Sequence, residues 1–485
     1  MLKRKILPIF CGIILLFSTI ATNLTANAAF NPSFELHSEG VYMVNLDTDI
    51  VVAEKNPDKR LYPASVTKIM TALVAFENIK DFNKKLECPY DCFNEFQWGG
   101  DPNYYDASTG GIDPYQDNLT YMDCLYALMV ASACEAGNII AYNVCGDIPT
   151  FINLMNETAK KIGCENTHFA NTHGLWNENN YTSARDMYKI TRYAMDNYEG
   201  FNKICNTYEY KMPANEHNPG GYTLYQTNAM MSESSEYYFE GCTGVKTGSI
   251  YEYYLKKGDG WDTENPVLGS RSLVTVAEQN GYRYLCVTLS APYYNPDGTS
   301  PEKVFSYSDH INLYNWAFGE FEYSKVVDKN QQIMQVDVIK GKEAEVVGLV
   351  TTEDYFTLMP KSLDKSAIQL IKPDVQPLTA PVEKDMEMGE VELRLNGEKL
   401  TAIPLVTETA IELDKIADYK EKLENFLKSP VTIAAFVALV LLIVALIVIV
   451  TINKHRKQRA AEMNRRRKIR MTPPRNGRNS RNNRK

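Results

Sequence analysis

A serine and a lysine three positions apart, Ser65 and Lys68, open an apolar stretch that ends at Phe76. Pro63 cannot continue a helix from before it, and the apolar residues that follow recur at helical spacing, so the sequence predicts a helix from Ser65. Residues three apart share one helix face, which brings the hydroxyl to the amine. Because this helix is apolar nearly all round, we expect it to be buried, and burial favours a neutral amine that accepts the serine proton.

The serine–lysine spacing is a weak signal on its own, because Ser362 and Lys365 repeat it in a polar stretch. Two further patterns follow it along the chain. Residues 132–134 read Ser-Ala-Cys in a break between two predicted helices, and residues 246–248 read Lys-Thr-Gly at the end of a predicted strand. The order and the context of the patterns together predict that they meet in one cleft.

Acyl transfer is the chemistry that these residues suit. Ser65 would attack a carbonyl carbon while Lys68 takes its proton, and a backbone N–H at the helix start would stabilise the oxyanion. Ser132 would relay a proton to the leaving amine. The sequence therefore predicts Ser65, Lys68 and Ser132 as catalytic residues.

The Lys-Thr-Gly pattern predicts a binding edge for the same reaction. A cation and a hydroxyl at a strand edge suit an anionic terminus, so Lys246 and Thr247 would hold a substrate carboxylate. Gly248 would let the substrate backbone approach that edge closely.

The elements that must position these residues form two predicted domains. Strands at both ends of residues 30–322 enclose several helices, which predicts an α/β (α+β) domain whose sheet is completed by the late strands. Short alternating strands then predict a small all-β domain over residues 326–412. The elements predicted in the first domain are strands within 39–55 and at 242–248, 271–279 and 282–290, two helices within 121–145, and helices at 150–163, 183–197 and about 303–319.

Two stretches lack a sustained period. Residues 86–120 predict a long loop near the cleft entrance, and residues 251–270 a hydrophilic insertion. In a third, turn-rich segment, we expect Asn171, His173 and Arg185 to hold loops together by hydrogen bonds.

Both ends of the chain predict export and membrane attachment. Residues 1–29 have a basic start, an apolar run and a small-residue cleavage site, as in a signal peptide. Residues 413–430 predict a helical stalk, and the 22 uncharged residues 431–452 are long enough to cross a bilayer. The tail, residues 453–485, carries 14 Lys or Arg against one acid, which predicts a cytoplasmic tail and an extracytoplasmic catalytic part.

Charge and cysteine content exclude other classes. Of 51 basic residues, 14 lie in the tail and three in the signal segment, which leaves 34 against 59 acidic residues in the exported part. This balance argues against nucleic acid as a partner. Nine cysteines remain after Cys11, their pairing cannot be read from sequence, and their spacing does not favour a metal site. We expect no metal and no cofactor.

The chain resembles the D-alanyl-D-alanine carboxypeptidases, low-molecular-weight penicillin-binding proteins of the serine peptidase class. The three patterns match the S-x-x-K, S-x-N and K-T-G motifs of penicillin-binding proteins and β-lactamases. The stretch LTAPVEKDMEMGEVELRLNGEKLTAIPLV resembles the C-terminal β domain of the family. In the catalytic region, the most specific parts of the resemblance are LYPASVTKIMTALV, ALMVASACEAGN, FANTHGL, YTSARDM and GVKTG.

This resemblance implies a penicillin-binding-protein/β-lactamase-like transpeptidase domain followed by a small all-β domain. It implies removal of the terminal D-alanine from the pentapeptide stem of peptidoglycan through an acyl-enzyme on Ser65, which β-lactams would form as inhibitors. It also implies an oxyanion hole made of the N–H groups of Ser65 and Ser249.

The chain departs from the family at two points. The middle motif usually ends in Asn, and Cys134 stands there, so that a thiol replaces the amide that would orient Lys68 and the substrate amide. We expect activity to survive with an altered rate. The second departure is a full membrane span in place of an amphipathic surface helix.

Three other readings stay open. A β-lactamase would use the same serine and lysine, but the chain shows no E-x-x-L-N pattern for deacylation. A non-catalytic, membrane-tethered wall-binding or antibiotic-sensing protein would fit Cys134 and the basic tail. A transpeptidase or endopeptidase would differ only in the acceptor.

Overall fold

The computed structural model describes residues 30, 32–96, 107–252, 256–257, 260–261, 268–395 and 397–470. The predicted signal peptide and most of the predicted insertion at 251–270 lie outside them. The chain divides into two compact units. The first runs to Asp328 and includes 354–371 and 392–403, and the second comprises 329–353, 372–391 and the chain from Pro404 onward.

The first unit is built on a five-stranded antiparallel sheet in the order β2-β1-β9-β8-β5. The early hairpin therefore pairs with strands that come about 240 residues later, as the sequence predicted. The strands are β1 (Gly40–Asn45), β2 (Val51–Lys55), β5 (Cys242–Ile250), β8 (Ser270–Gln279) and β9 (Tyr282–Pro292).

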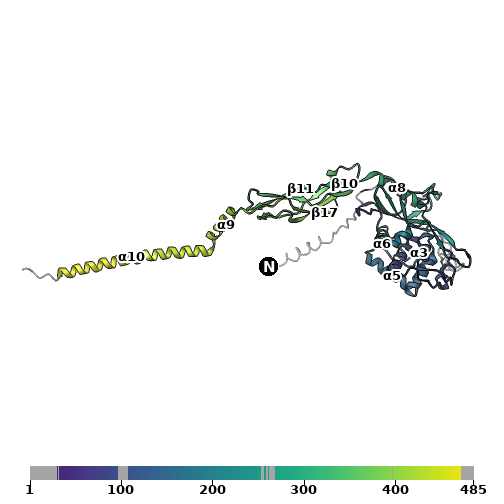
Figure 1. Ribbon diagram of the computed structural model, residues 1–485, viewed down its shortest axis with the longest axis horizontal. Helices are drawn as coiled ribbons and strands as arrows, with labels where there is room; N and C mark the ends of the chain where they lie inside the picture. Colours follow the sequence, from purple (N-terminus) through teal and green to yellow (C-terminus); the bar gives the residue numbers. More distant parts are fainter. Residues whose placement is uncertain are drawn as a thin grey trace, which may run out of the picture. The chain divides into compact units, whose positions relative to one another are not determined.

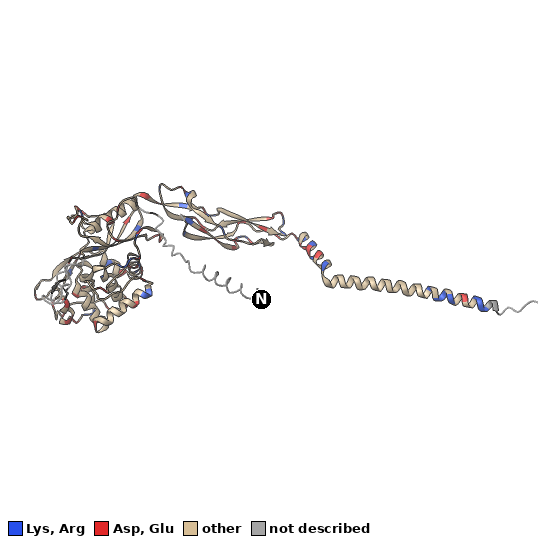
Figure 2. Cartoon of the chain, turned by 180° about the vertical axis from the view of Figure 1, so that it is seen from behind, with Lys and Arg blue, Asp and Glu red and all other residues tan. Residues whose placement is uncertain are grey.

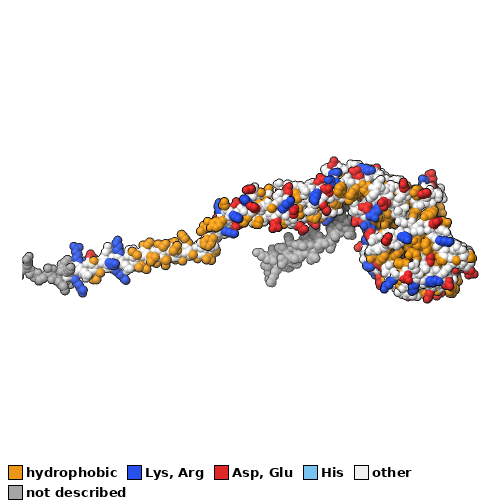
Figure 3. All heavy atoms as spheres, viewed as in Figure 1, with side chains coloured by type: hydrophobic (Ala, Val, Ile, Leu, Met, Phe, Trp, Pro, Cys, Tyr) orange, Lys and Arg blue, Asp and Glu red, His pale blue; other side chains and the backbone are white. Residues whose placement is uncertain are grey.

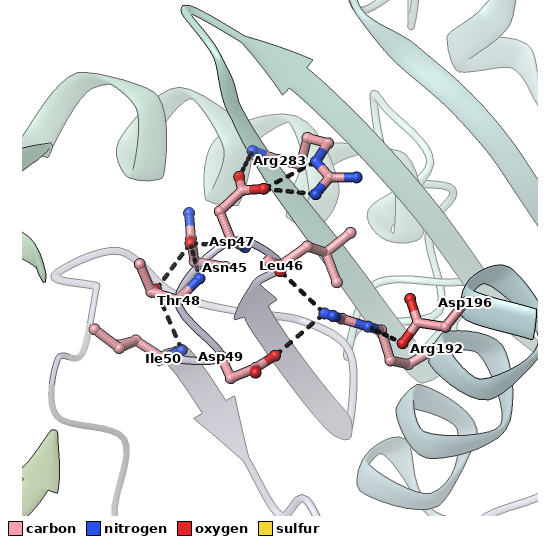
Figure 4. Close-up of polar contacts among 9 residues, drawn as sticks. All are labelled: Asn45, Leu46, Asp47, Thr48, Asp49, Ile50, Arg192, Asp196 and Arg283. Carbon is pink, nitrogen blue, oxygen red and sulfur yellow. Dashed lines mark hydrogen bonds and ion pairs between the residues drawn. The ribbon is translucent and has the colours of Figure 1, made fainter. Parts of the chain in front are cut away.

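The turn between β1 and β2 is fastened to its neighbours by polar contacts (Figure 4). Asn45 Oδ1 accepts hydrogen bonds from the backbone N–H groups of Asp47, at 3.2 Å, and Thr48, at 3.0 Å. The Asp47 carboxylate accepts from Arg283 of β9 at 2.6 Å, and Arg192 donates to Asp49 at 3.2 Å. These contacts fix the turn between β1 and β2 to β9 and α6.

Helices pack on both faces of this sheet, as alternation along β9 shows. Leu285 and Val287 point into the larger core, and Tyr284 and Cys286 point into the smaller one. Figure 1 shows α3, α5 and α6 gathered together, with α8 at a separate place. The helices of the larger core are α2 (Thr67–Asn78), α3 (Tyr121–Val130), α4 (Cys134–Cys145), α5 (Ile148–Ile162), α6 (Ala184–Asn197) and α7 (Glu199–Cys205), and α8 (Phe305–Glu320) supplies the smaller one.

Local signals explain the helix ends. The Thr120 side chain accepts from the Asp123 N–H in a capping box at the start of α3, and Asp147 and Ser183 cap α5 and α6 in the same sense. The structure adds elements that the sequence analysis missed. These are α7, the hairpin of β3 (Glu209–Met212) and β4 (Tyr222–Tyr225), and the 3₁₀ segment η2 (Tyr90–Phe96) within the predicted long loop.

Alternating strands follow α8, as predicted. In the first unit β10 (Phe321–Val327) pairs with β13 (Tyr355–Pro360), and in the second β12 (Val346–Thr351) pairs with β11 (Gln332–Ile339). The end of β17 (Glu398–Thr407) adds to β12. Side chains of β11 alternate between buried and exposed, which is the period of a strand with one face in a core.

The chain continues into two helices, α9 (Lys415–Lys428) and α10 (Pro430–Arg470). Figure 2 shows the first part of α10 without charge and basic residues gathered at its far end, and Figure 3 shows the uncharged part covered with apolar side chains. By length and composition α10 could cross a membrane.

All nine cysteines of the described chain are free thiols. Six of them are buried, and burial raises the pKa of Cys88 and of Cys92, each to about 12. No disulfide therefore constrains the described part of the long loop.

Candidate active site

The three predicted clusters meet at one cavity of about 280 Å³ in the first unit. Ser65 and Ser132 reach it from the helices, and Thr247, Gly248 and Ser249 reach it from β5. The other residues that line it are Ser108, Thr227, Arg271, Ser272, Leu273, Val304, Ser306 and Tyr307. Residues up to 242 positions apart in sequence thus share one polar cleft.

Lys68 is the centre of the buried side of the site. Its Nζ lies 2.8 Å from Ser65 Oγ, 2.6 Å from the carbonyl oxygen of His173 and 3.5 Å from Cys134 Sγ. Lys68 is fully buried, and this loss of hydration lowers the pKa of its amine, while Cys134 and Glu135 act in the opposite direction. The amine is therefore suited to accept the Ser65 proton.

The nucleophile sits in a tighter turn than predicted. Ser65 lies in the 3₁₀ segment η1 (Ala64–Val66), and α2 begins only at Thr67. Residues three apart eclipse in such a turn, which still brings Ser65 over Lys68. Ala64 has a φ of 52°. A Cβ on Gly174 would lie 1.9 Å from the carbonyl oxygen of Ala64. Only glycine fits there, so the turn at 171–175 lies directly against the nucleophile.

The break between α3 and α4 delivers the second cluster. Ser132 is buried with a φ of 61°, an uncommon conformation for a residue with a side chain, and it lines the cavity. Cys134 N donates to the carbonyl of Ser108 at 2.8 Å, which fastens the start of α4. The Cys134 side chain is buried beside Phe96 and Leu175, so it faces Lys68 rather than the described lining of the cavity.

The two cations on the strand side of the site, Lys246 and Arg271, differ in their access to the cavity. Lys246 is fully buried, donates to its neighbour's carbonyl at 3.0 Å, and lies outside the described residues that line the cavity. Burial and the nearby Lys68 lower the pKa of Lys246. Arg271 of β8, opposite Ser249 in the sheet, lines the cavity, and its guanidinium lies 4.1 Å from the centre of the Tyr293 ring.

Thr247 and Gly248 lie at the meeting point of strand and nucleophile. Thr247 Oγ1 is 2.7 Å from Thr227 Oγ1, which orients its hydroxyl. A Cβ on Gly248 would lie 3.1 Å from the Ser65 backbone nitrogen, so a side chain there would crowd that N–H. Ser249 also lines the cavity, as Ser65 does.

The turn-rich segment holds loops together as predicted. Asn171 accepts from Gly174 N at 2.7 Å and donates to the Leu175 carbonyl at 2.8 Å. Arg185 reaches Asp58 and Tyr42 at 2.9 Å each. His173 contacts Glu95 through its ring, and its backbone carbonyl contacts Lys68.

The sequence analysis missed Arg271, Thr227 and the His173 carbonyl. Arg271 could have been found only from the register of β8 on β5, because nothing in its own neighbourhood marks it. A backbone carbonyl carries no signature in sequence at all.

Comparisons with known proteins place both parts of the chain. Residues 25–252 match the family described as D-alanyl-D-alanine carboxypeptidase, and residues 321–413 match the one described as penicillin-binding protein 5, C-terminal domain. The chain is 27% identical over 410 residues to D-alanyl-D-alanine carboxypeptidase DacF of Bacillus subtilis (strain 168), covering 83% of this chain and 93% of that protein. It is 26% identical over 366 residues to DacC of Escherichia coli (strain K12), covering 75% and 81%.

Solved structures agree on the fold. Penicillin binding protein 5 from Haemophilus influenzae has a TM-score of 0.54 at 22% identity, over 79% of this chain and 99% of that one. DacD from Francisella tularensis has a TM-score of 0.56 at 21% identity, over 79% and 95%. The predicted fold class, a penicillin-binding-protein-like transpeptidase domain followed by a small β domain, is confirmed.

Proposed function

We propose that the chain is a serine peptidase that removes the terminal D-alanine from peptidoglycan pentapeptide stems, because residues 25–252 match the D-alanyl-D-alanine carboxypeptidase family. One observation supports this most directly. The nucleophile Ser65 and the buried base Lys68 are 2.8 Å apart at a polar cavity. An amine held in that place is what activation of the serine hydroxyl requires.

Acylation would begin with transfer of the Ser65 proton to Lys68 Nζ. The Ser65 oxygen forms a bond to the carbonyl carbon of the penultimate D-alanine, and the carbonyl electrons move to oxygen. The N–H groups of Ser65 and Ser249, two residues that line the cavity, would stabilise the developing oxyanion.

Collapse of that intermediate breaks the peptide C–N bond. The departing amine needs a proton, and Ser132 is the hydroxyl at the cavity that would pass it on from Lys68. Free D-alanine leaves, and the shortened stem remains as an ester on Ser65. Water attacks this ester with Lys68 as base, which restores the Ser65 hydroxyl and releases the acid.

Recognition of the terminal carboxylate would fall to Arg271 and Thr247. Both line the cavity, whereas Lys246 is buried. A guanidinium binds a carboxylate through paired N–H donors, and stacking on Tyr293 limits the orientations that Arg271 adopts. Lys246 would act behind these groups, by its effect on Lys68 and on the position of β5.

Mass spectrometry of the chain after penicillin treatment, with incubation on a D-Ala-D-Ala-terminated peptide, tests the proposal. We expect a penicilloyl adduct on Ser65 that persists, together with release of D-alanine from the peptide. An adduct that turns over rapidly would identify a β-lactamase, and an adduct without D-alanine release would identify a penicillin-binding sensor. Transfer of the stem to an added amine would identify a transpeptidase.

We also propose that α10 anchors the enzyme in the cell membrane, with residues 453–485 in the cytoplasm, the catalytic part outside and residues 1–29 as the signal peptide. The apolar part of α10 and the basic residues at its far end support this orientation. Protease added to intact cells should remove the catalytic part and leave the tail. Digestion of the tail under the same conditions would contradict the orientation.

A further inference from the structure

We propose that Glu95 is a positioning residue for Lys68, because its hydrogen bond with the His173 ring fixes the backbone carbonyl that accepts a hydrogen bond from the Lys68 amine. The inference rests on the proposed function, since it concerns the base that would activate Ser65. It gives a role to η2, an element that the sequence did not predict and that no motif marks.

The first step is the set of contacts around Lys68 Nζ. Its shortest contact is to the carbonyl oxygen of His173, at 2.6 Å, and Ser65 Oγ lies at 2.8 Å. A neutral amine that donates one N–H to this carbonyl and another toward Cys134 turns its lone pair to the Ser65 hydroxyl. The His173 carbonyl therefore decides where the basic electron pair points.

The second step is what holds that carbonyl. It belongs to the peptide group shared with Gly174, whose N–H donates to Asn171 Oδ1 at 2.7 Å. Gly174 has a φ of 84°, and glycine permits rotation of this peptide plane at little cost. Asn171 holds this plane from the Gly174 side, so the other side depends on what fixes His173.

The third step is the His173 ring, which is held at both nitrogens. Nδ1 accepts a hydrogen bond from the Leu175 N–H at 3.2 Å, so Nε2 carries a hydrogen and donates a hydrogen bond to Glu95 Oε1 at 3.0 Å. The edge of the Phe96 ring also packs on the His173 ring, with centroids 5.2 Å apart. One short segment thus supplies both the polar and the apolar contact to His173.

Glu95 is itself bound into the wall of the site. Its Oε1 accepts from Asn138 Nδ2 of α4 at 2.6 Å, and Asn138 Oδ1 accepts from Thr172 at 2.6 Å. The His173 side chain is 1% exposed, but that of Glu95 is 43% exposed. Burial alone would raise the pKa of Glu95, and the interactions with His173 and Asn138 lower it overall, so the carboxylate stays charged while it faces solvent.

The test is the rate of Ser65 acylation by a fluorescent penicillin across a pH series, on the full chain in detergent. The variants are Glu95→Ala, Glu95→Gln, which keeps the acceptor oxygen, and Asp91→Ala as the matched control on the same element. We expect Glu95→Ala to lower the plateau rate about tenfold and to move the acidic limb to lower pH, because protonated Lys68 loses a well-placed acceptor. Glu95→Gln should lie between Glu95→Ala and wild type, and Asp91→Ala should match wild type.

Two outcomes would overturn the inference. One is a Glu95→Ala profile equal to wild type, and the other is a lower plateau with the acidic limb unmoved, which would mean a structural role only. The thermal unfolding midpoint of each variant shows whether it is folded. If Glu95→Ala is misfolded, the pH profile of Glu95→Gln decides the test. If wild type itself is not acylated, the proposed function fails rather than the role of Glu95.

Discussion

The two walls of the cavity use their polar groups in opposite ways. On the helical wall, Lys68 and Cys134 are buried, and Ser65 is the group that they present to the cavity. On the strand wall, Thr247 and Arg271 face the cavity directly. Burial changes the proton affinity of the first set, and access to the substrate defines the second. In the proposed mechanism, reactivity and recognition therefore fall on separate elements, and substitutions should separate them.

The largest effect is expected from Ser65→Ala. Removal of the nucleophile should lower acylation by penicillin about 10³-fold or more, because the lysine base has nothing left to activate. Intact-mass measurement after penicillin treatment reports it. The matched control is Ser362→Ala, which removes the serine of the other S-x-x-K pattern on an exposed turn and should leave the adduct unchanged. An adduct that persists on Ser65→Ala would place the nucleophile elsewhere.

Lys68→Arg comes next and tests the helical wall as a source of basicity. A guanidinium stays protonated, so acylation should fall about 10²–10⁴-fold although the positive charge is kept. In wild type, burial lowers the pKa of Lys68. The neutral, active amine should therefore predominate already at a pH below the ordinary lysine range. The acylation rate should rise as the pH increases through that lowered pKa. Stopped-flow acylation over a pH series measures both. A wild-type rate that falls over this range would contradict the role of the base.

Arg271→Ala should affect recognition and leave nucleophile activation intact. We expect kcat/KM for a D-Ala-D-Ala peptide to fall about 10–100-fold, which corresponds to one charge-assisted carboxylate contact. A peptide with a C-terminal amide supplies the decisive comparison, because it lacks the carboxylate and should be cleaved equally slowly by wild type and variant. Arg283→Ala, whose partner is Asp47 at the far turn, should match wild type on both peptides. Equal losses on the two peptides would remove Arg271 from carboxylate binding.

The smallest effect is expected from Cys134→Ala. The thiol contacts Lys68 and raises the pKa of its amine against the larger effect of burial, so its removal should move the acidic limb of acylation to lower pH. The plateau should change by less than about tenfold, since the His173 carbonyl remains the shorter contact. Loss of acylation on the scale of Lys68→Arg would show that Cys134 is itself needed for catalysis.

Much of this comparison could be predicted from sequence, for physical reasons that differ between the walls. Ser65 and Lys68 are close in the chain, and their apolar surroundings predict burial directly. The central strands of the sheet are largely apolar runs with turn residues at their ends. Lys246 was predicted to bind the carboxylate because its charge and position suggested it, but exposure is a tertiary property, and the structure places Arg271 at the cavity and buries Lys246.

The parts that could not be predicted depend on distant pairings. Arg271 reaches the cavity only through the register of β8 on β5, and Glu95 meets His173 across 78 positions from a loop without periodicity. The short elements α7, β3 and β4 offer too few residues for a pattern to emerge. The start of α2 was placed two residues early. A serine and a lysine three residues apart fit both a 3₁₀ turn and the first turn of an α-helix.

The nine unpaired thiols have a practical consequence for the life of this enzyme. Core packing and hydrogen bonds stabilise the described parts of the chain without disulfides. Folding should therefore need no oxidising partner, and the fold should tolerate reductants that would unfold a protein stabilised by disulfides. The same polypeptide should reach its native state in a reducing bacterial cytosol. Because six of the nine sulfurs are buried in the folded protein, accidental cross-linking would threaten chiefly a molecule that has not yet folded.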